Sequence, residues 1–534
     1  MIVTENSHQI FVIENTEREV LRKKYWSSLS NEILNAHGNI HTSEYSEVLL
    51  IFKDCLRFLI DEFEQILLKE KQLSFYKYIF LLHEQSIKLQ FDLNEGYILT
   101  NITEVSLAYY RRVLKLILEQ GVMIDLEDNQ NLDTEECRRI ENLLPCILYL
   151  GEFIYEFAEL YSIESMINDF YEVQFIDGLF DYSPQYHYDL AYTTMMPIIN
   201  NLNQKSYYDK VAEIDFVSLI NDTFKVDFIK LIDIYQVLQS KFEKNTSFMT
   251  PEYQYLESIT KRLYPTSVDV DKMWRGLILD KSNKLSIFNS VTSPRQVNRY
   301  LYRPVIVYNV DNQRYAFFSW NKITESFHML SHNVNWGKFP SEWGKIAKVK
   351  QYIEYKRDNH ESLFINGVKS IIESKKLLYA LNIKSFEQKN KTNVNIVQKC
   401  GEIDGIIIKF PLIIVIEAKY NMPAYDACSF RGDYSHFTEK YEKQLKRKID
   451  WVQQNKTIIS EHFSIIGKKD VNLQLFHVFG VFLINTSTFY MLNGKYKTIA
   501  FGEFSDFLDG RIGVDIRDKS TGKVIVWPYF DGPQ

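Results

Sequence analysis

The stretch Cys400–Tyr420, CGEIDGIIIKFPLIIVIEAKY, contains two apolar runs separated by a short turn signal. The runs are Ile406–Ile408 and Leu412–Ile416, and the segment Lys409–Pro411 lies between them. Short apolar runs on either side of such a signal are typical of two adjacent, buried strands. The sequence therefore predicts a strand pair with an apolar centre and polar outer ends.

Charged side chains gather at those outer ends. Glu402 and Asp404 are two positions apart, as are Glu417 and Lys419, so each pair shares one face of its strand. If the strands form a hairpin, Asp404 lies across from the segment Glu417–Lys419. A buried sheet tolerates such charges only when something compensates them. Mg²⁺ does so with one or two carboxylates, waters and substrate phosphate, so we expect a Mg²⁺ site in which Mn²⁺ can substitute. We interpret Glu402 as a neighbour of this site and not as a ligand.

The string Gly401–Gly405, GEIDG, followed at hairpin distance by Glu417–Lys419, EAK, resembles the PD-(D/E)xK nuclease superfamily. The resemblance covers Trp343–Asn485, roughly a quarter of the chain, and Ile403 stands where the motif name has a proline. It implies a restriction-endonuclease-like α/β domain and a metal-dependent nuclease. The roles that it implies are metal ligation by Asp404, Glu417 and the backbone carbonyl of Ala418, and catalysis by Lys419.

The same resemblance implies a further glutamate on the helix that precedes the first strand. Glu354, Glu361 and Glu373 compete for this role, and we choose Glu361 as a metal ligand because His360–Ser374 is the last amphipathic helix before the sheet. Glu361 could equally be a solvated or capping residue.

The helix expected after the strand pair, within Tyr441–Trp451, offers a catalytic Gln444. Lys448 lies one turn on along the same face. Both residues are expected to contact substrate phosphate or the metal-bound water, with a plain exposed helix face as the alternative.

The rest of the chain predicts several domains. Apolar residues recur at helical spacing through Glu14–Arg262, for example in Tyr45–Lys69 and Ile102–Gln120. Arg303–Trp320 reads as a hairpin with a turn at Asp311-Asn312, and from Leu378 onward the order is three strands, a helix and a strand. We predict a multidomain chain with four parts: an acidic, mostly α-helical regulatory or oligomerisation region at 1–262, a mixed α/β connector at 263–342, an α/β nuclease domain with a mixed sheet at 343–495, and a tail packed on that domain at 496–534.

Charge is unevenly divided along the chain. Met1–Arg262 carries about 23 Lys and Arg against about 42 Asp and Glu, roughly −19, and the remainder carries roughly +12. We therefore expect the C-terminal half to meet a polyanion, most simply DNA, and the helical half to bind a second copy or a partner protein. The most apolar stretch, Leu143–Leu160, is interrupted by a proline and three glutamates, so no membrane span is expected. Five scattered cysteines, no CxxC pair and no secretory signal favour the cytoplasm.

Together these patterns predict a Mg²⁺-dependent endonuclease that hydrolyses phosphodiester bonds, with antiphage defence as the role that the resemblance suggests. One alternative is a type II-like, sequence-specific restriction endonuclease whose target-recognition part lies in Pro265–Gly344. Another is a partner-binding scaffold with an inactive nuclease fold. The chain has no GxxxxGK[ST] loop, so we expect no ATPase.

Overall fold

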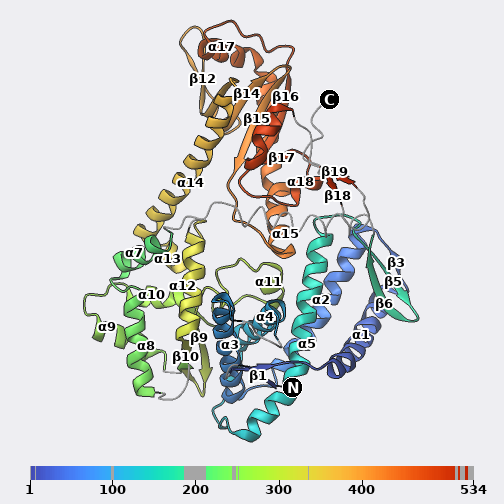
Figure 1. The fold of residues 1–534 in the computed structure, drawn as a ribbon, viewed down its shortest axis with the longest axis vertical. Coiled ribbons are helices and arrows are strands. Elements are labelled where there is room, and N and C mark those ends of the chain that lie inside the picture. Colours follow the sequence, from blue (N-terminus) through green and yellow to red (C-terminus); the bar gives the residue numbers. More distant parts are fainter. Residues whose placement is uncertain are drawn as a thin grey trace. The chain divides into compact units, whose positions relative to one another are not determined.

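The fold comes from a computed structural model, which describes residues 2–5, 8–97, 102–185, 212–242, 248–249, 252–334, 336–510, 515–517 and 524–526. The chain forms two compact units (Figure 1). The N-terminal unit comprises the described residues within 1–164, 169–183 and 209–356, and the C-terminal unit is built mainly from residue 357 onward. Each unit has its own sheets and its own hydrophobic core.

Long amphipathic helices dominate the first part of the N-terminal unit. In α2 (Tyr45–Leu67) the buried residues follow the three- and four-residue spacing of one helix face, from Val48 to Leu67. The helix α4 (Glu104–Gly121) begins with a capping box in which Thr103 and Ser106 bond each other's backbone amides. Both helices confirm the predicted helical pattern. The remaining helices and strands of this part are β1 (Ile2–Glu5), β2 (His8–Phe11), α1 (Asn15–His37), β3 (His41–Thr42), α3 (Leu73–Asn94), β4 (Asp125–Leu126), α5 (Thr134–Glu164), β5 (Tyr171–Ile176) and β6 (Leu179–Pro184).

None of the helices in the described part of the chain is long and apolar enough to cross a membrane. The helix α5 contains Leu143–Leu160, the stretch considered above as a membrane span, and also Pro145. The hairpin that follows this helix was not predicted from the sequence. There, Asp177 and Gly178 both have positive φ, 51° and 78°, and connect the neighbouring strands β5 and β6.

The predicted hairpin at Arg303–Trp320 is confirmed. The strands β9 (Val305–Val310) and β10 (Gln313–Ser319) pair antiparallel, and Asp311 and Asn312 take φ of 47° and 65° in the turn between them. Positive φ at both turn residues matches the right-handed twist of the flanking strands. The other elements of this part are α7 (Ala212–Phe224), α8 (Phe228–Phe242), β7 (Phe248–Met249), α9 (Gln254–Leu263), α10 (Val270–Leu277), β8 (Ile278–Leu279), α11 (Ile287–Thr292), α12 (Trp320–Val334), α13 (Ser341–Gly344) and α14 (Ala347–Ser374).

The predicted connector, 263–342, shares its core with the helices before it. Phe216 and Leu256 from the preceding region pack in one buried cluster with Met273, Phe318 and Trp343. The segments on both sides of the predicted boundary at residue 262 therefore contribute to one continuous core, and the described chain on both sides folds as part of one unit.

A five-stranded mixed sheet forms the centre of the C-terminal unit, in the order β11-β14-β15-β16-β17. The strand β14 is antiparallel to both of its neighbours, whereas β15, β16 and β17 run parallel to one another. A mixed sheet following the helical region is the coarse fold that the sequence predicted. The elements of this unit are β11 (Leu378–Ile383), β12 (Ser385–Glu387), β13 (Asn393–Asn395), β14 (Ile403–Lys409), β15 (Leu412–Lys419), α15 (Ala427–His436), the π-helical turn η1 (Phe437–Tyr441), α16 (Glu442–Gln454), α17 (Lys456–Gly467), β16 (His477–Ile484), α18 (Tyr490–Asn493), β17 (Lys497–Ala500), η2 (Phe501–Glu503), α19 (Phe504–Asp509), β18 (Asp515–Arg517) and β19 (Val524–Val526).

Helices cover the two faces of this sheet. On one face, Val368 and Ile372 of α14 pack with Ile414 and Ile416 of β15. Because successive strand residues alternate between faces, Val415 and Glu417 point to the opposite side. Here α16 packs on β16 so closely that a Cβ atom at Gly480 would lie 2.2 Å from Cδ1 of Ile449. The alternation therefore places Glu417 beneath α16.

Candidate active site

The hairpin of β14 and β15 brings two carboxylates together. Gly405 is paired with Ile416, so continuing the antiparallel register by one position places Asp404 opposite Glu417. The backbone amide of Ala418 donates a 2.7 Å hydrogen bond to Oδ2 of Asp404. The side chain of Asp404 is 24% exposed and that of Glu417 is 3% exposed, so the pair combines one accessible and one buried carboxylate. The predicted position of Asp404 across from Glu417–Lys419 is confirmed.

Two lysines pair with these carboxylates. Nζ of Lys419 lies 2.5 Å from Oε1 of Glu417. Lys448, on α16, forms an ion pair with Oε2 of Glu417 and lies 3.2 Å from Oδ1 of Asp404. Each oxygen of Glu417 therefore faces an ammonium group, which offsets the cost of burying the carboxylate.

The two lysines do not fully compensate the negative charge of the Asp404 carboxylate. Burial, with a further contribution from the Glu417 carboxylate, raises the pKa of Asp404 to about 6, although Lys448, Lys419 and the Ala418 amide all act to lower it. Burial also acts to lower the pKa of Lys448, but Asp404 and Glu417 outweigh it and raise that pKa. An additional positive charge at Asp404 is thus electrostatically favourable.

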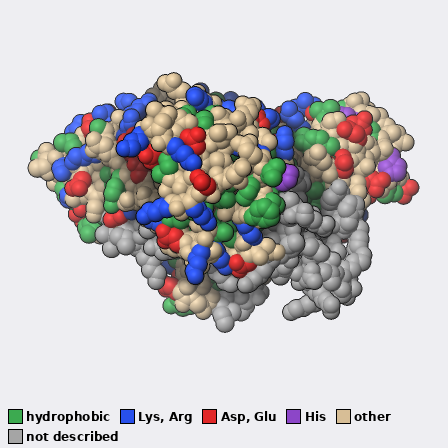
Figure 2. Space-filling view, turned by 90° about the horizontal axis from the view of Figure 1, so that it is seen from above, with side chains coloured by type: hydrophobic (Ala, Val, Ile, Leu, Met, Phe, Trp, Pro, Cys, Tyr) green, Lys and Arg blue, Asp and Glu red, His purple; other side chains and the backbone are tan. Residues whose placement is uncertain are grey.

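A cavity of about 720 Å³ opens onto this cluster within the C-terminal unit. Asp404, Ala418 and Lys419 line it together with Gln444, while the basic side chains of Lys384 and Lys440 also contribute. On the wider surface, Lys and Arg side chains are interspersed with Asp and Glu on the face drawn in Figure 2. The basic residues that can contact a ligand bound at the carboxylates are therefore those that line the cavity.

Sequence reasoning missed Tyr441. The π-helical turn η1 ends at this residue, which lines the cavity, and Nζ of Lys419 lies 4.7 Å from the centre of its ring. π-Helical turns are rare and frequently occur at functional sites. The spacing of the residues could have indicated Tyr441 as a site residue. It precedes Gln444 by three residues and therefore lies on the same side of the helix.

The far end of β15 is held by a second feature that the sequence did not indicate. Asn485, directly after β16, accepts a 2.7 Å hydrogen bond from the backbone amide of Asn421 and donates one of 2.9 Å to its carbonyl oxygen. Asn421 also lines the cavity. This side-chain clamp fixes the chain just beyond Lys419, so it restricts where that lysine can lie.

The other predicted residues have different outcomes. Gln444 lines the cavity, whereas Lys448 contacts the two carboxylates and not an open ligand space. Glu402 lines the same cavity and lies 3.6 Å from Lys384. The side chain of Glu361 falls outside the described residues. Its competitor Glu373 accepts a 2.6 Å hydrogen bond from Tyr379 at the end of α14.

The oxygen donors suit a hard divalent cation. Among the side chains that the structure describes, no group of three or more His, Cys, Asp or Glu residues is placed to hold a metal ion. Asp404 and Glu417 together supply two carboxylates, and Mg²⁺ typically takes one or two from a protein and completes its shell with water and phosphate. Such a cation would compete with Lys448 for the oxygens of Asp404.

Comparisons of the chain with protein families, curated proteins and solved structures find no match. The chemistry of the site therefore depends on its own residues. These are the carboxylates of Asp404 and Glu417, the ammonium group of Lys419, and a cavity lined by charged and aromatic side chains.

Proposed function

We propose that the C-terminal unit is a Mg²⁺-dependent nuclease with a restriction-endonuclease-like fold. One observation carries the proposal: Asp404 and Glu417 from adjacent strands converge with Lys419 at one sheet end, where Asp404 and Lys419 line a cavity. Asp404, Glu417 and the carbonyl of Ala418 would hold Mg²⁺ or Mn²⁺. When bound, the cation neutralises phosphate charge and lowers the pKa of a coordinated water.

The chain's own side chains would orient the substrate and place charge around it. Lys419 lines the cavity between the Glu417 carboxylate and the Tyr441 ring, so its ammonium group can donate to a phosphate oxygen or to the attacking water. Lys448 is buried against Glu417 and neutralises it from the side of α16. The amide of Ala418 orients Asp404 through their hydrogen bond. These contacts preorganise the carboxylates before substrate arrives.

The substrate class follows from charge. Arg357, Lys384, Lys419 and Lys440 line the cavity against three carboxylates, Asp358, Glu402 and Asp404, which leaves a charge of +1 when all seven are ionised. Arg357 and Lys384 pair with Asp358 and Glu402, so the attraction of a phosphodiester group falls mainly to Lys419 and Lys440. We propose DNA as the substrate because the motif resembles that of DNA-cleaving enzymes, and a role in antiphage defence on the same ground. The proposed activity does not require sequence recognition.

The test is cleavage by the purified full-length protein. Supercoiled plasmid, linear duplex DNA and single-stranded RNA are each incubated with Mg²⁺, Mn²⁺ or EDTA. We expect DNA cleavage that needs a divalent cation, is lost in Asp404→Ala and is retained in Asp450→Ala. Asp450 is a suitable control because it is a half-exposed carboxylate on α16 that pairs with Lys446.

The cutting pattern separates the alternatives. Discrete bands would favour a type II-like restriction endonuclease, and a continuous smear a nonspecific effector. Cleavage that persists in EDTA or in Asp404→Ala would contradict the assignment of the site. Failure of the wild-type protein to cut any of the three substrates would favour the inactive scaffold.

A further inference from the structure

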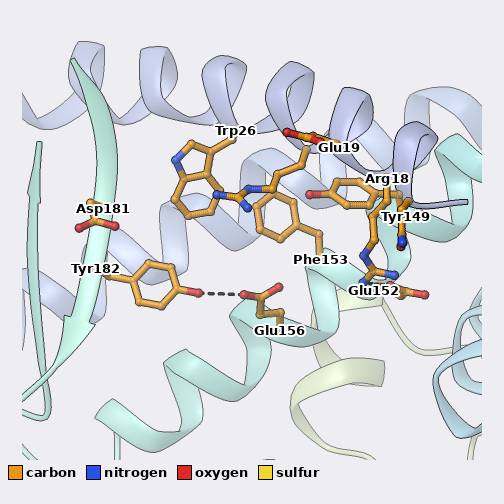
Figure 3. A pocket seen from close by; sticks show the side chains of 11 residues that line it. Arg18, Glu19, Trp26, Tyr149, Glu152, Phe153, Glu156, Asp181 and Tyr182 are labelled. Atoms are coloured by element: carbon orange, nitrogen blue, oxygen red, sulfur yellow. Dashed lines mark hydrogen bonds and ion pairs between the residues drawn. The ribbon is translucent and has the colours of Figure 1, made fainter. Parts of the chain in front are cut away.

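A second cavity lies in the N-terminal unit. None of its lining residues belongs to the candidate active site, and all of them are distant from that site in the sequence. The cavity has a volume of about 620 Å³ and is bordered by α1, α5 and β6 (Figure 3). Pockets for small molecules typically measure about 300–1,000 Å³. This cavity is therefore large enough for a ligand, and its lining indicates which kind.

Aromatic rings form one part of the lining. Trp26 of α1 stacks on Phe153 of α5, with ring centres 5.6 Å apart, and lies 6.1 Å from the ring of Tyr182 on β6. In Figure 3 these three rings border the same space. Nε1 of Trp26 donates a 2.8 Å hydrogen bond to the carbonyl oxygen of Phe180, so the indole has no further donor to offer. What Trp26 presents to a ligand is its π-surface, which attracts cations.

Carboxylates form the other part. Glu19, Glu152, Glu156 and Asp181 line the cavity together with two basic residues, Arg18 and Arg22, which leaves a charge of −2 when all six are ionised. Arg18 pairs with Glu152 at 2.7 Å, and this pair cancels within the lining. Glu19 lies 3.8 Å from Lys23, so the excess negative charge belongs to Glu156 and Asp181, with Arg22 as the opposing cation in the lining.

One of these carboxylates, Glu156, lies beside the aromatic rings (Figure 3). Glu156 accepts a 2.8 Å hydrogen bond from the Tyr182 hydroxyl through Oε1, which orients it toward the rings. A carboxylate has about four lone-pair sites, so Glu156 can accept further hydrogen bonds. Asp181 precedes Tyr182 on β6 and also lines the cavity. Aromatic faces beside excess carboxylates favour a cationic ligand and disfavour a phosphate or a carboxylic acid.

We propose that this cavity binds an organic cation, an amine or a guanidine, with its charged group at Glu156 and Asp181 and its apolar part against Trp26 and Phe153. The ammonium or guanidinium group can belong to a free small molecule or to a Lys or Arg side chain of a bound peptide. The chemistry of recognition is the same in both cases, and the two sources are separated by experiment. The proposal is independent of the nuclease activity.

The test uses the full-length protein, freed of nucleic acid, in calorimetric titrations. Spermidine and agmatine serve as small cations, a lysine- and arginine-rich dodecapeptide serves as the macromolecular source, and inorganic phosphate serves as an anionic probe. We expect saturable binding of at least one cation, no binding of phosphate, and an affinity at least about tenfold lower in Glu156→Gln/Asp181→Asn. Binding of spermidine or agmatine would identify a small-molecule site, and binding of the peptide alone a protein-docking site.

The control variant is Glu32→Gln/Glu135→Gln, which removes two exposed carboxylates of α1 and α5 outside the cavity lining. It should bind the cation as the wild type does. Equal binding by wild type, the cavity variant and the control would mean nonspecific attraction to an acidic surface and would overturn the proposal, as would failure of all three cations to bind. A titration of tryptophan fluorescence in wild type and Trp26→Phe reports whether the ligand reaches this ring. If the ligand changes the fluorescence of Trp26→Phe as much as that of the wild type, the result also contradicts the site.

Discussion

Lys448 on α16 and Glu417 on β15 form an ion pair in which both side chains are almost fully buried, with 6% and 3% of their surfaces exposed. The pair joins a helix to the centre of the sheet at the candidate active site. Buried charges cost free energy to desolvate, so removing one partner leaves the other uncompensated. This relationship allows the stability of the site to be tested separately from its activity.

Lys448→Met should destabilise the protein by about 3–5 kcal/mol, because Glu417 would lose one of its two ammonium partners while remaining buried. Chemical denaturation followed by circular dichroism measures the change. Lys446→Met is the matched control, since Lys446 is 59% exposed in its pair with Asp450 and should cost no more than about 1 kcal/mol. Adding Glu417→Gln to Lys448→Met should recover part of the loss. Equal effects of the two lysine variants would contradict the buried pair.

Asp404→Asn should stabilise the metal-free protein above pH 6. The pKa of Asp404 is raised to about 6 in the folded state, against about 3.9 for an unfolded chain. The folded state therefore binds the proton more tightly, and its stability falls as pH rises between these two values and is constant above them. Asn cannot ionise, so the variant avoids a loss on the order of 3 kcal/mol. Melting temperatures in EDTA at pH 4 and pH 7.5 measure this, and a gain that is equal at both pH values would rule out the raised pKa.

Lys419→Ala should lose most cleavage while retaining cation binding. An ammonium group cannot ligate a metal, so its loss should reduce turnover and not metal affinity. Glu417→Ala should instead weaken Mn²⁺ binding, because a carboxylate oxygen leaves the site. Mn²⁺ calorimetry beside single-turnover cleavage distinguishes these effects. Lys419→Arg keeps the charge but does not readily release a proton, so its activity would point to electrostatic stabilisation and its inactivity to proton transfer or tight geometry. Wild-type cleavage by Lys419→Ala would count against the nuclease assignment.

Gly480→Ala should destabilise the C-terminal unit by about 1–3 kcal/mol, because the added Cβ would lie 2.2 Å from Cδ1 of Ile449 on α16. Ile449→Val in the same chain should relieve part of the strain by removing that methyl group. Gly432→Ala, in α15, is the control, since nothing lies within 4 Å of its Cβ position and Ala favours a helix. Thermal denaturation of the three variants measures the effect. A neutral Gly480→Ala would mean that α16 does not pack against β16 as described.

The hairpin that carries Asp404 and Glu417 was predictable from the sequence because its information is local. The apolar runs Ile406–Ile408 and Leu412–Ile416 are joined by a short turn, and a side-chain period of two then determines which polar residues share a face. The turn also determines the register, so the position of Asp404 across from the segment Glu417–Lys419 followed from counting, and the structure pairs it with Glu417. The helices α2 and α4 were predictable for the same reason, since their apolar spacing needs no distant partner.

Contacts between distant segments depend on packing that no local pattern encodes. Lys448 is 31 residues from Glu417 in the chain, and it contacts that carboxylate only because α16 packs against the sheet beside Gly480. The cavity of the N-terminal unit combines Trp26 with Phe153 and Tyr182, which meet only after α1, α5 and β6 have come together. Local hydrophobic periodicity therefore determines which face of an element is buried, whereas the partner of that face is selected by shape and charge complementarity across the whole fold.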